Sequence, residues 1–138
     1  MARGAAVTFA GQKSKKIVFP LTRAEASNFT ETSRYEDVMN FISELQKESN
    51  DFNIEYFGTT FEGKKLPLVI FSFAYGAFGQ PKVFSPLEAK RLGKPIVFVM
   101  ANIHAGEVEG KEAAQMIMRE MVAGGSVSGV RYLRCMDL

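Results

Sequence analysis

The segment from Pro95 to Ala101 constrains the fold of this chain more than any other part of the sequence. It reads PIVFVMA and contains no polar side chain. Such a run is typical of a strand covered on both faces of a sheet. A polar loop, Asn102 to Glu107, follows, and the residues after Gly106 predict a helix that ends at Gly124-Gly125. The apolar side of that helix is predicted to comprise Ala113, Met116, Ile117 and Met121. This order predicts an open α/β sheet with a site at the carboxyl end of the strand.

The residues before this unit predict a helix followed by a hairpin. A helix is expected over residues 34–48, because apolar residues recur there at helical spacing. Ser33 and Glu36 have the spacing of a capping box at its start. Two segments rich in strand-forming residues, Asn53 to Thr59 and Leu66 to Phe73, flank a glycine turn and predict a hairpin. The second arm is almost entirely apolar, so it too is expected to be covered on both faces.

Two further segments carry local signals. Ser85 followed by Pro86 is the pattern of a capping residue and a first helical residue, and Gly93 is a stop signal, so a short helix is expected between them. Residues 1–32 show no sustained period and are interpreted as a lead-in arm.

Composition narrows the function classes. A length of 138 residues with 46% hydrophobic residues suits one domain with a sizeable core. The net charge of +2 gives no support for a nucleic-acid partner. No apolar run reaches the ~18 residues that a membrane helix needs, so no membrane partner is expected. The single cysteine, Cys135, excludes an internal disulfide, and any imidazole chemistry must use the single histidine, His104.

His104 and Glu107 are the candidate metal ligands. They share the loop after the predicted strand at a spacing of three residues. A neutral imidazole and a carboxylate are both good zinc ligands, and a pair that leaves coordination positions open is typical of a catalytic site. The alternative reading is structural: the histidine is satisfied by backbone groups, and Glu107 favours the positive end of the helix dipole. Spacing alone leaves both readings open.

The wider sequence resembles one known family. The run Lys94 to Ala113, KPIVFVMANIHAGEVEGKEA, resembles the segment around the first two zinc ligands of the zinc carboxypeptidase family. The preceding hairpin turn, Gly58 to Leu68, also resembles that family in order and spacing. The resemblance implies a three-layer α/β fold with a mixed sheet, of which the first strands and helices are expected here, so the domain would be truncated. The chain then divides into a lead-in arm (1–32), the amino-terminal portion of the domain (33–125) and a divergent tail (126–138).

The resemblance also implies roles for residues. His104 and Glu107 would be the first two zinc ligands, which makes a partial zinc site. The third ligand, a histidine, and the glutamate that acts as general base are expected beyond Leu138, so no catalytic residue is assigned within the chain and the substrate-binding residues are unknown. Only Cys135, Asp137 or a carboxylate from a second copy could complete the set here. Glu109 and Glu112 fit better as first-turn carboxylates favoured by the helix dipole than as a general base.

Three functions follow as hypotheses. The first is a zinc-dependent metallocarboxypeptidase-like hydrolase that removes C-terminal residues from peptides, present here as an incomplete and inactive form. The second is a deacylase that acts on small acylated amino acids with the same ligand pair. The third is a non-catalytic fragment that associates with a partner, or with itself, through an exposed sheet edge. Localisation stays open: members of the family are commonly exported, while Met1 to Pro20 lacks the apolar core of a signal peptide.

Overall fold

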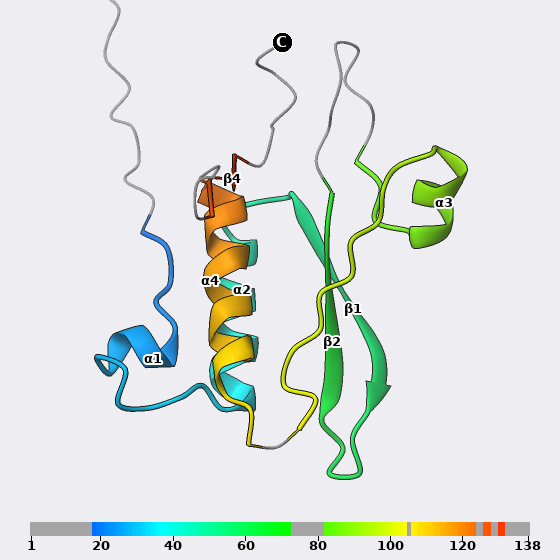
Figure 1. The fold of residues 1–138 in the computed structure, drawn as a ribbon. Helices are drawn as coiled ribbons and strands as arrows, with labels where there is room; N and C mark the ends of the chain where they lie inside the picture. Colours follow the sequence, from blue (N-terminus) through cyan, green and yellow to red (C-terminus); the bar gives the residue numbers. More distant parts are fainter. Residues whose placement is uncertain (1–17, 73–81, 105, 124–125, 128–129, 132–138) are drawn as a thin grey trace, which may run out of the picture.

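A computed structural model describes residues 18–72, 82–104, 106–123, 126–127 and 130–131 (Figure 1). This part of the chain is a mixed α/β structure. Its elements, in chain order, are α1 (Arg23–Ala26), α2 (Tyr35–Gln46), β1 (Phe52–Thr59), β2 (Lys65–Phe71), α3 (Pro86–Arg91), α4 (Glu109–Ala123), β3 (Ser126–Val127) and β4 (Val130–Arg131). The strands form two antiparallel pairs, β1 with β2 and β3 with β4. No described helix is long and apolar enough to cross a bilayer.

The core lies between two parallel helices and the hairpin. Helices α2 and α4 run side by side, and the hairpin of β1 and β2 stands next to them (Figure 1). The buried apolar cluster takes side chains from all three parts: Phe41, Ile42 and Leu45 of α2, Phe52 of β1 and Val122 of α4. Leu45 is fully buried, at 0% exposure. Helix α2 is therefore the element around which the apolar core is built.

The hairpin confirms the predicted pair of strands and its turn. Phe52 pairs with Phe71 at the open end, and their rings stack with centroids 4.9 Å apart. The turn is closed where Thr60 N–H donates to the Lys64 carbonyl at 2.7 Å, and Gly63 adopts a φ of 79°, which favours glycine. The register shifts between Tyr56 and Gly58. The residues of β2 are half-buried or exposed, so the expectation of a strand covered on both faces is wrong for the described structure.

The start of α2 corrects the predicted capping box. Asp37, and not Glu36, accepts a hydrogen bond from the N–H of Arg34, at 2.8 Å. Ser33 is buried, and its hydroxyl donates to Glu112 of α4 at 3.0 Å. The local pattern failed because a partner 79 residues away takes the serine side chain. The short helix α3 follows its prediction: Ser85 caps it, Pro86 opens it, and Gly93 follows it with a φ of 68°.

Helix α4 turns a polar face inward, which also differs from the sequence prediction. Glu112 and Gln115 are buried at 8% and 1% exposure, whereas Ala113 of the predicted apolar side is exposed. Met116, Ile117 and Met121 are half-buried. The predicted side followed from the spacing of apolar residues, and a buried carboxylate that finds several hydrogen-bond donors adds nothing to that spacing.

Side chains on the inward face of α4 hold the residues before α2 in place. We call the hydrogen bonds of Glu112 with Thr32 and Ser33 the Glu112 clamp. The Glu112 carboxylate accepts hydrogen bonds from the Thr32 hydroxyl at 2.9 Å, the Ser33 hydroxyl and the Ser33 N–H. Burial alone raises the pKa of Glu112, but these hydrogen bonds outweigh it and hold the pKa below its ordinary value. Gln115 adds a hydrogen bond from its amide nitrogen to the Ser33 hydroxyl, at 3.1 Å. The carboxylate therefore stays ionised in a buried position.

A second clamp holds α1, an element that the sequence analysis did not predict. Thr22 and Glu25 form a complete capping box, the one local signal that marks this short helix. Arg119 of α4 donates to both carboxylate oxygens of Glu25 at 2.6 Å and to the Pro20 carbonyl at 3.0 Å. The hydrogen bond from Arg119 is the main reason that the pKa of Glu25 lies below its ordinary value. Residues 20–33 are thus held against α4.

The segment Pro95–Ala101 is not a strand in the described structure, so the predicted strand covered on both faces is wrong there. It runs as an extended coil on the β2 side of the hairpin and joins no ladder among the described residues (Figure 1). Its large side chains are exposed, from 56% for Ile96 to 85% for Val97. Extended apolar backbone becomes a strand only when a neighbour takes up its hydrogen bonds. We call residues 96–100 the apolar strip.

The described core predicts a large loss of stability for Leu45→Ala. Removing a fully buried leucine side chain at the contact of α2, β1 and α4 is expected to lower the free energy of unfolding by about 2–5 kcal/mol. Urea unfolding followed by circular dichroism measures this change. The matched control is Leu87→Ala on α3, where the side chain is 79% exposed, with an expected change within about 0.5 kcal/mol. Equal effects of the two substitutions would contradict the assigned core.

The Glu112 clamp predicts a specific pH dependence of stability. Because its folded pKa lies below the ordinary 4.5, folding favours the ionised form. The clamp therefore contributes fully above pH 4.5 and is lost as the pH falls through the lowered folded pKa. Glu112→Gln is expected to cost about 1–3 kcal/mol at pH 7 and to make the acid-side loss shallower. Urea unfolding at pH 7, 5 and 3 measures both effects, with Glu55→Gln on the exposed face of β1 as control. A parallel pH profile for Glu112→Gln and the unmodified chain would refute the clamp.

Candidate metal site

The loop that carries His104 and Glu107 joins the extended segment after α3 to the start of α4. It lies at the end of the molecule where α2 and α4 both begin (Figure 1). Helix α4 starts at Glu109, two residues after Glu107. The clamp between Glu112 and Ser33 lies one turn further into the same helix. The position of the loop is therefore tied to the way in which α4 packs on α2.

The two candidate ligands face each other. His104 Nδ1 and Glu107 Oε1 lie 2.7 Å apart. The backbone supports this approach: Glu107 N–H donates to the His104 carbonyl at 3.1 Å, and His104 N–H donates to Glu107 Oε2 at 3.4 Å. The side-chain hydrogen bond with His104 is the largest cause of a pKa of Glu107 below its ordinary value. Both side chains remain accessible, at 79% and 50% exposure.

The pair could bind a zinc ion only after a rearrangement, because the 2.7 Å contact is a hydrogen bond whose proton zinc would have to displace. Nitrogen and oxygen ligands bind zinc at about 2.0–2.2 Å, so two ligands at tetrahedral positions lie about 3.3 Å apart. His104 Nδ1 and Glu107 Oε1 would have to separate by only about 0.6 Å, which exposed side chains can do. The nitrogen on the metal side would be Nδ1, since that atom faces the carboxylate. The same contact also satisfies the structural reading, in which the pair closes the turn without a metal.

The described residues contribute no further ligand to this pair. Within them, no group of three or more His, Cys, Asp or Glu side chains could hold a metal ion. Glu112 is buried and occupied by Ser33 and Thr32, so its carboxylate is unsuited to the general-base role weighed for it. The Glu109 carboxylate accepts a hydrogen bond from the N–H of Val108 at 3.1 Å, as expected near a helix start. Cys135 and Asp137 lie outside the described residues.

Two residues that the sequence analysis passed over also shape the loop. The Asn102 side chain accepts a hydrogen bond from the N–H of Lys111 at 2.9 Å, and its backbone has a φ of 58°. Gly110 packs so closely on Ala101 that a Cβ at Gly110 would lie 2.6 Å from the Ala101 Cβ. A cap that lies nine residues before its N–H partner is outside the local spacings that mark helix starts. The signal available in the sequence was only an asparagine in the loop and a glycine near the helix start.

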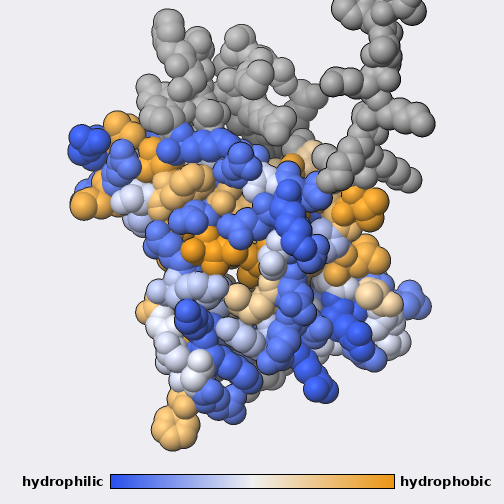
Figure 2. Space-filling model, turned by 180° about the vertical axis from the view of Figure 1, so that it is seen from behind, coloured by the Kyte–Doolittle hydropathy of each residue, from blue (hydrophilic) through white to orange (hydrophobic). Residues whose placement is uncertain are grey.

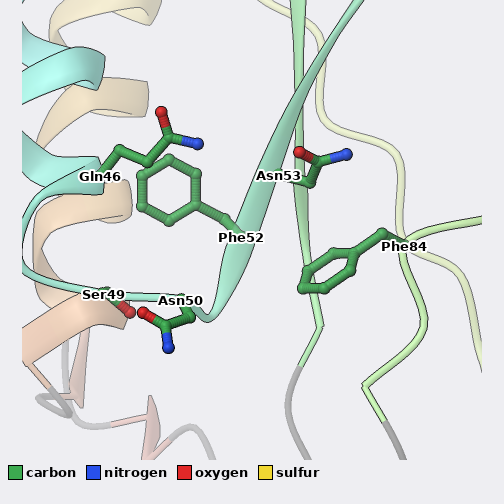
Figure 3. Close-up of a pocket in the computed structure, with 6 residues that line it drawn as sticks. All are labelled: Gln46, Ser49, Asn50, Phe52, Asn53 and Phe84. Atoms are coloured by element: carbon green, nitrogen blue, oxygen red, sulfur yellow. The ribbon is translucent and has the colours of Figure 1, made fainter.

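A separate hollow lies at the other end of α2, near the start of β1 (Figure 3). Its volume is about 330 Å³, and its lining consists of Gln46, Ser49, Asn50, Phe52, Asn53 and Phe84. None of these side chains is a carboxylate, an imidazole or a thiol, so the hollow holds no general base and no strong metal ligand. The hollow therefore offers no second candidate metal site beside the His104 loop.

Comparison with known proteins gives one match. A family model described as zinc carboxypeptidase matches residues 38–137. This range begins within α2 and includes the hairpin and both candidate ligands. Neither a curated protein nor a solved structure matches the chain.

Proposed function

The chain belongs to the zinc carboxypeptidase family, and on that premise we propose that His104 and Glu107 supply two ligands of a catalytic zinc in a peptidase that removes C-terminal residues. The observation that carries the proposal is the 2.7 Å approach of His104 Nδ1 to Glu107 Oε1 at an accessible loop. A bound zinc supplies polarisation of the scissile carbonyl and a water of lowered pKa.

The residues of this chain have separate tasks in the proposal. His104 and Glu107 would hold the metal, and their exposure would leave it accessible to water and a peptide. The carboxylate of an exposed glutamate is ionised at neutral pH, which is the form that binds a cation. A third ligand and a general base have to come from outside the described residues. We therefore expect the described residues by themselves to bind zinc weakly.

The proposal also concerns the fold. A three-layer domain with a mixed sheet would place the apolar strip inside the sheet, with helices on both faces. The described residues support only the coarser statement, a helix pair against a hairpin with the strip uncovered beside it. Peptides and small acylated amino acids remain the substrate classes to compare, because both reactions use the same ligand pair.

Zinc titration tests the proposed site. We expect a Kd in the micromolar range or weaker, about −8 kcal/mol or less favourable, because two ligands hold the ion. His104→Ala and Glu107→Gln are each expected to weaken binding at least about tenfold, since even the partners of metal ligands matter that much. Competition with a chelating dye gives the Kd, and the signals of the only imidazole report binding by NMR.

Glu109→Gln is the matched control, because this carboxylate lies two residues further along and is already hydrogen-bonded to Val108. It should leave the Kd unchanged. Zinc binding that is insensitive to His104→Ala would overturn the assignment of the ligands. Nanomolar affinity would instead show that other residues complete the site within the chain or in a dimer.

A second candidate function is association between copies of this chain. The apolar strip supports it, because five large side chains are exposed on an extended backbone without ladder partners among the described residues. Antiparallel pairing about Phe98 would place Val97 opposite Val99 of the second copy, and Ile96 opposite Met100. Such a pairing matches β-branched and large apolar residues across a two-fold axis. Exposed edges of this composition are known sites of strand addition.

Sedimentation velocity tests the association. The average mass is expected to rise above 15.3 kDa with concentration for the unmodified chain. Phe98→Glu should keep it near the monomer value, because two carboxylates would meet at the axis. Leu87→Glu introduces the same charge at an equally exposed leucine on α3 and should leave association unchanged. A constant monomer mass for the unmodified chain, or equal effects of both variants, would rule this candidate out.

A further inference from the structure

The loop that carries the candidate ligands is closed at its base by two contacts. Asn102 lies before the loop and Lys111 lies after it, and the Asn102 Oδ1 accepts the hydrogen bond of the Lys111 N–H at 2.9 Å. On the other side of the base, Gly110 lies against Ala101. Both ligands, His104 and Glu107, lie within the segment that these contacts enclose. The two ends of the segment are thus held together by residues that do not themselves bind metal.

The hydrogen bond from Lys111 serves two purposes. The first N–H groups of α4 lack partners within the helix, and Asn102 satisfies one of them from outside. The left-handed backbone at Asn102, with a φ of 58°, turns the chain out of the extended segment and toward the helix. Asparagine tolerates this conformation far better than β-branched or bulky residues do. Asn102 therefore provides both the turn of the backbone and the hydrogen bond that holds the two ends of the loop together.

Gly110 provides the space for the second contact. A Cβ at this position would lie 2.6 Å from the Cβ of Ala101, a separation that forces one of the two segments to shift. The Ala101 Cβ cannot rotate away, because it is attached directly to the backbone. Glycine at position 110 therefore lets the end of the extended segment approach the first turn of α4.

From these contacts we infer that Asn102 and Gly110 are positioning residues, which set the separation between His104 Nδ1 and Glu107 Oε1. The inference rests on the proposed function in one respect, namely that this pair binds zinc. The positioning itself is a property of the metal-free chain. Without the two contacts at the base, we expect the loop ends to separate and the local turn, in which backbone hydrogen bonds hold His104 and Glu107 together, to open.

The first experiment needs no metal. Nitrogen NMR of the only imidazole, at one fixed pH, reports whether Nδ1 is paired with a carboxylate. The unmodified chain should give a paired signature that Glu107→Gln removes. Asn102→Gly keeps the left-handed backbone but lacks the acceptor, so it should resemble Glu107→Gln. Asn102→Asp keeps an acceptor oxygen and should retain the paired signature. A thermal melt of each variant shows that the core is intact.

The second experiment moves one methyl group from position 101 to position 110. Gly110→Ala alone should remove the paired signature and weaken zinc binding about 10–100-fold, the range expected for residues that orient metal ligands. The double variant Ala101→Gly with Gly110→Ala moves the methyl group from one segment to the other. It should restore the NMR signature and bring the zinc Kd to within about threefold of the unmodified chain. Dye competition with zinc measures the Kd.

The outcomes separate the inference from the proposed function. Retention of the paired signature in both Asn102→Gly and Gly110→Ala would overturn the inference, whatever the chain does with zinc. An imidazole signature in the unmodified chain equal to that of Glu107→Gln would overturn it as well. A paired signature that follows the predicted pattern, together with zinc binding that ignores His104→Ala, would support positioning and reject the zinc proposal.

Discussion

The buried carboxylate of Glu112 is the interaction on which the rest of the described structure depends. A carboxylate inside a protein is tolerated only where hydrogen bonds replace its water. Here the donors come from Thr32 and Ser33, directly before α2. The requirement fixes the rotation of α4 about its axis and the register of α4 against α2 together. Only Val108 separates Glu107 from the start of α4. The hydrogen bonds of Glu112 therefore also set where the candidate ligands lie.

The apolar core uses only part of the apolar surface that the chain offers. Phe41, Ile42 and Leu45 close the contact between α2 and the hairpin. The apolar strip, by contrast, is exposed, and Phe57 and Phe61 of the hairpin region are exposed as well. Seen from behind, hydrophobic patches lie between hydrophilic regions of the surface (Figure 2). The described residues therefore combine a core at the helix pair with apolar surface that has no cover among them, which is why association is a natural second candidate.

The sequence correctly predicted the elements whose signals are local. The helix α2, the hairpin and the short helix α3 follow from periodicity, a glycine turn and a serine cap, all within a few residues of one another. It failed where the partner is distant in sequence. Ser33 has the pattern of a cap but binds Glu112, and α4 buries Gln115 instead of Ala113. Pro95–Ala101 has the composition of a strand, but composition cannot supply the neighbouring strand. The same holds for the site. The sequence predicted His104 and Glu107, which are neighbours in one loop, but not the contacts of Asn102 and Gly110 with residues nine positions away.

The sequence by itself determined which residues are available for chemistry. A single histidine, three residues before a glutamate and just ahead of a predicted helix, limits imidazole chemistry to one loop, and the family resemblance includes that loop. Only the tertiary structure decided that the two side chains face each other at 2.7 Å, that the inner face of α4 is polar, and that the strip is uncovered. The physical reason is common to all three. Hydrogen bonds and packing between distant segments depend on where the backbone goes, and that path is decided by the competition of all segments for the same buried space.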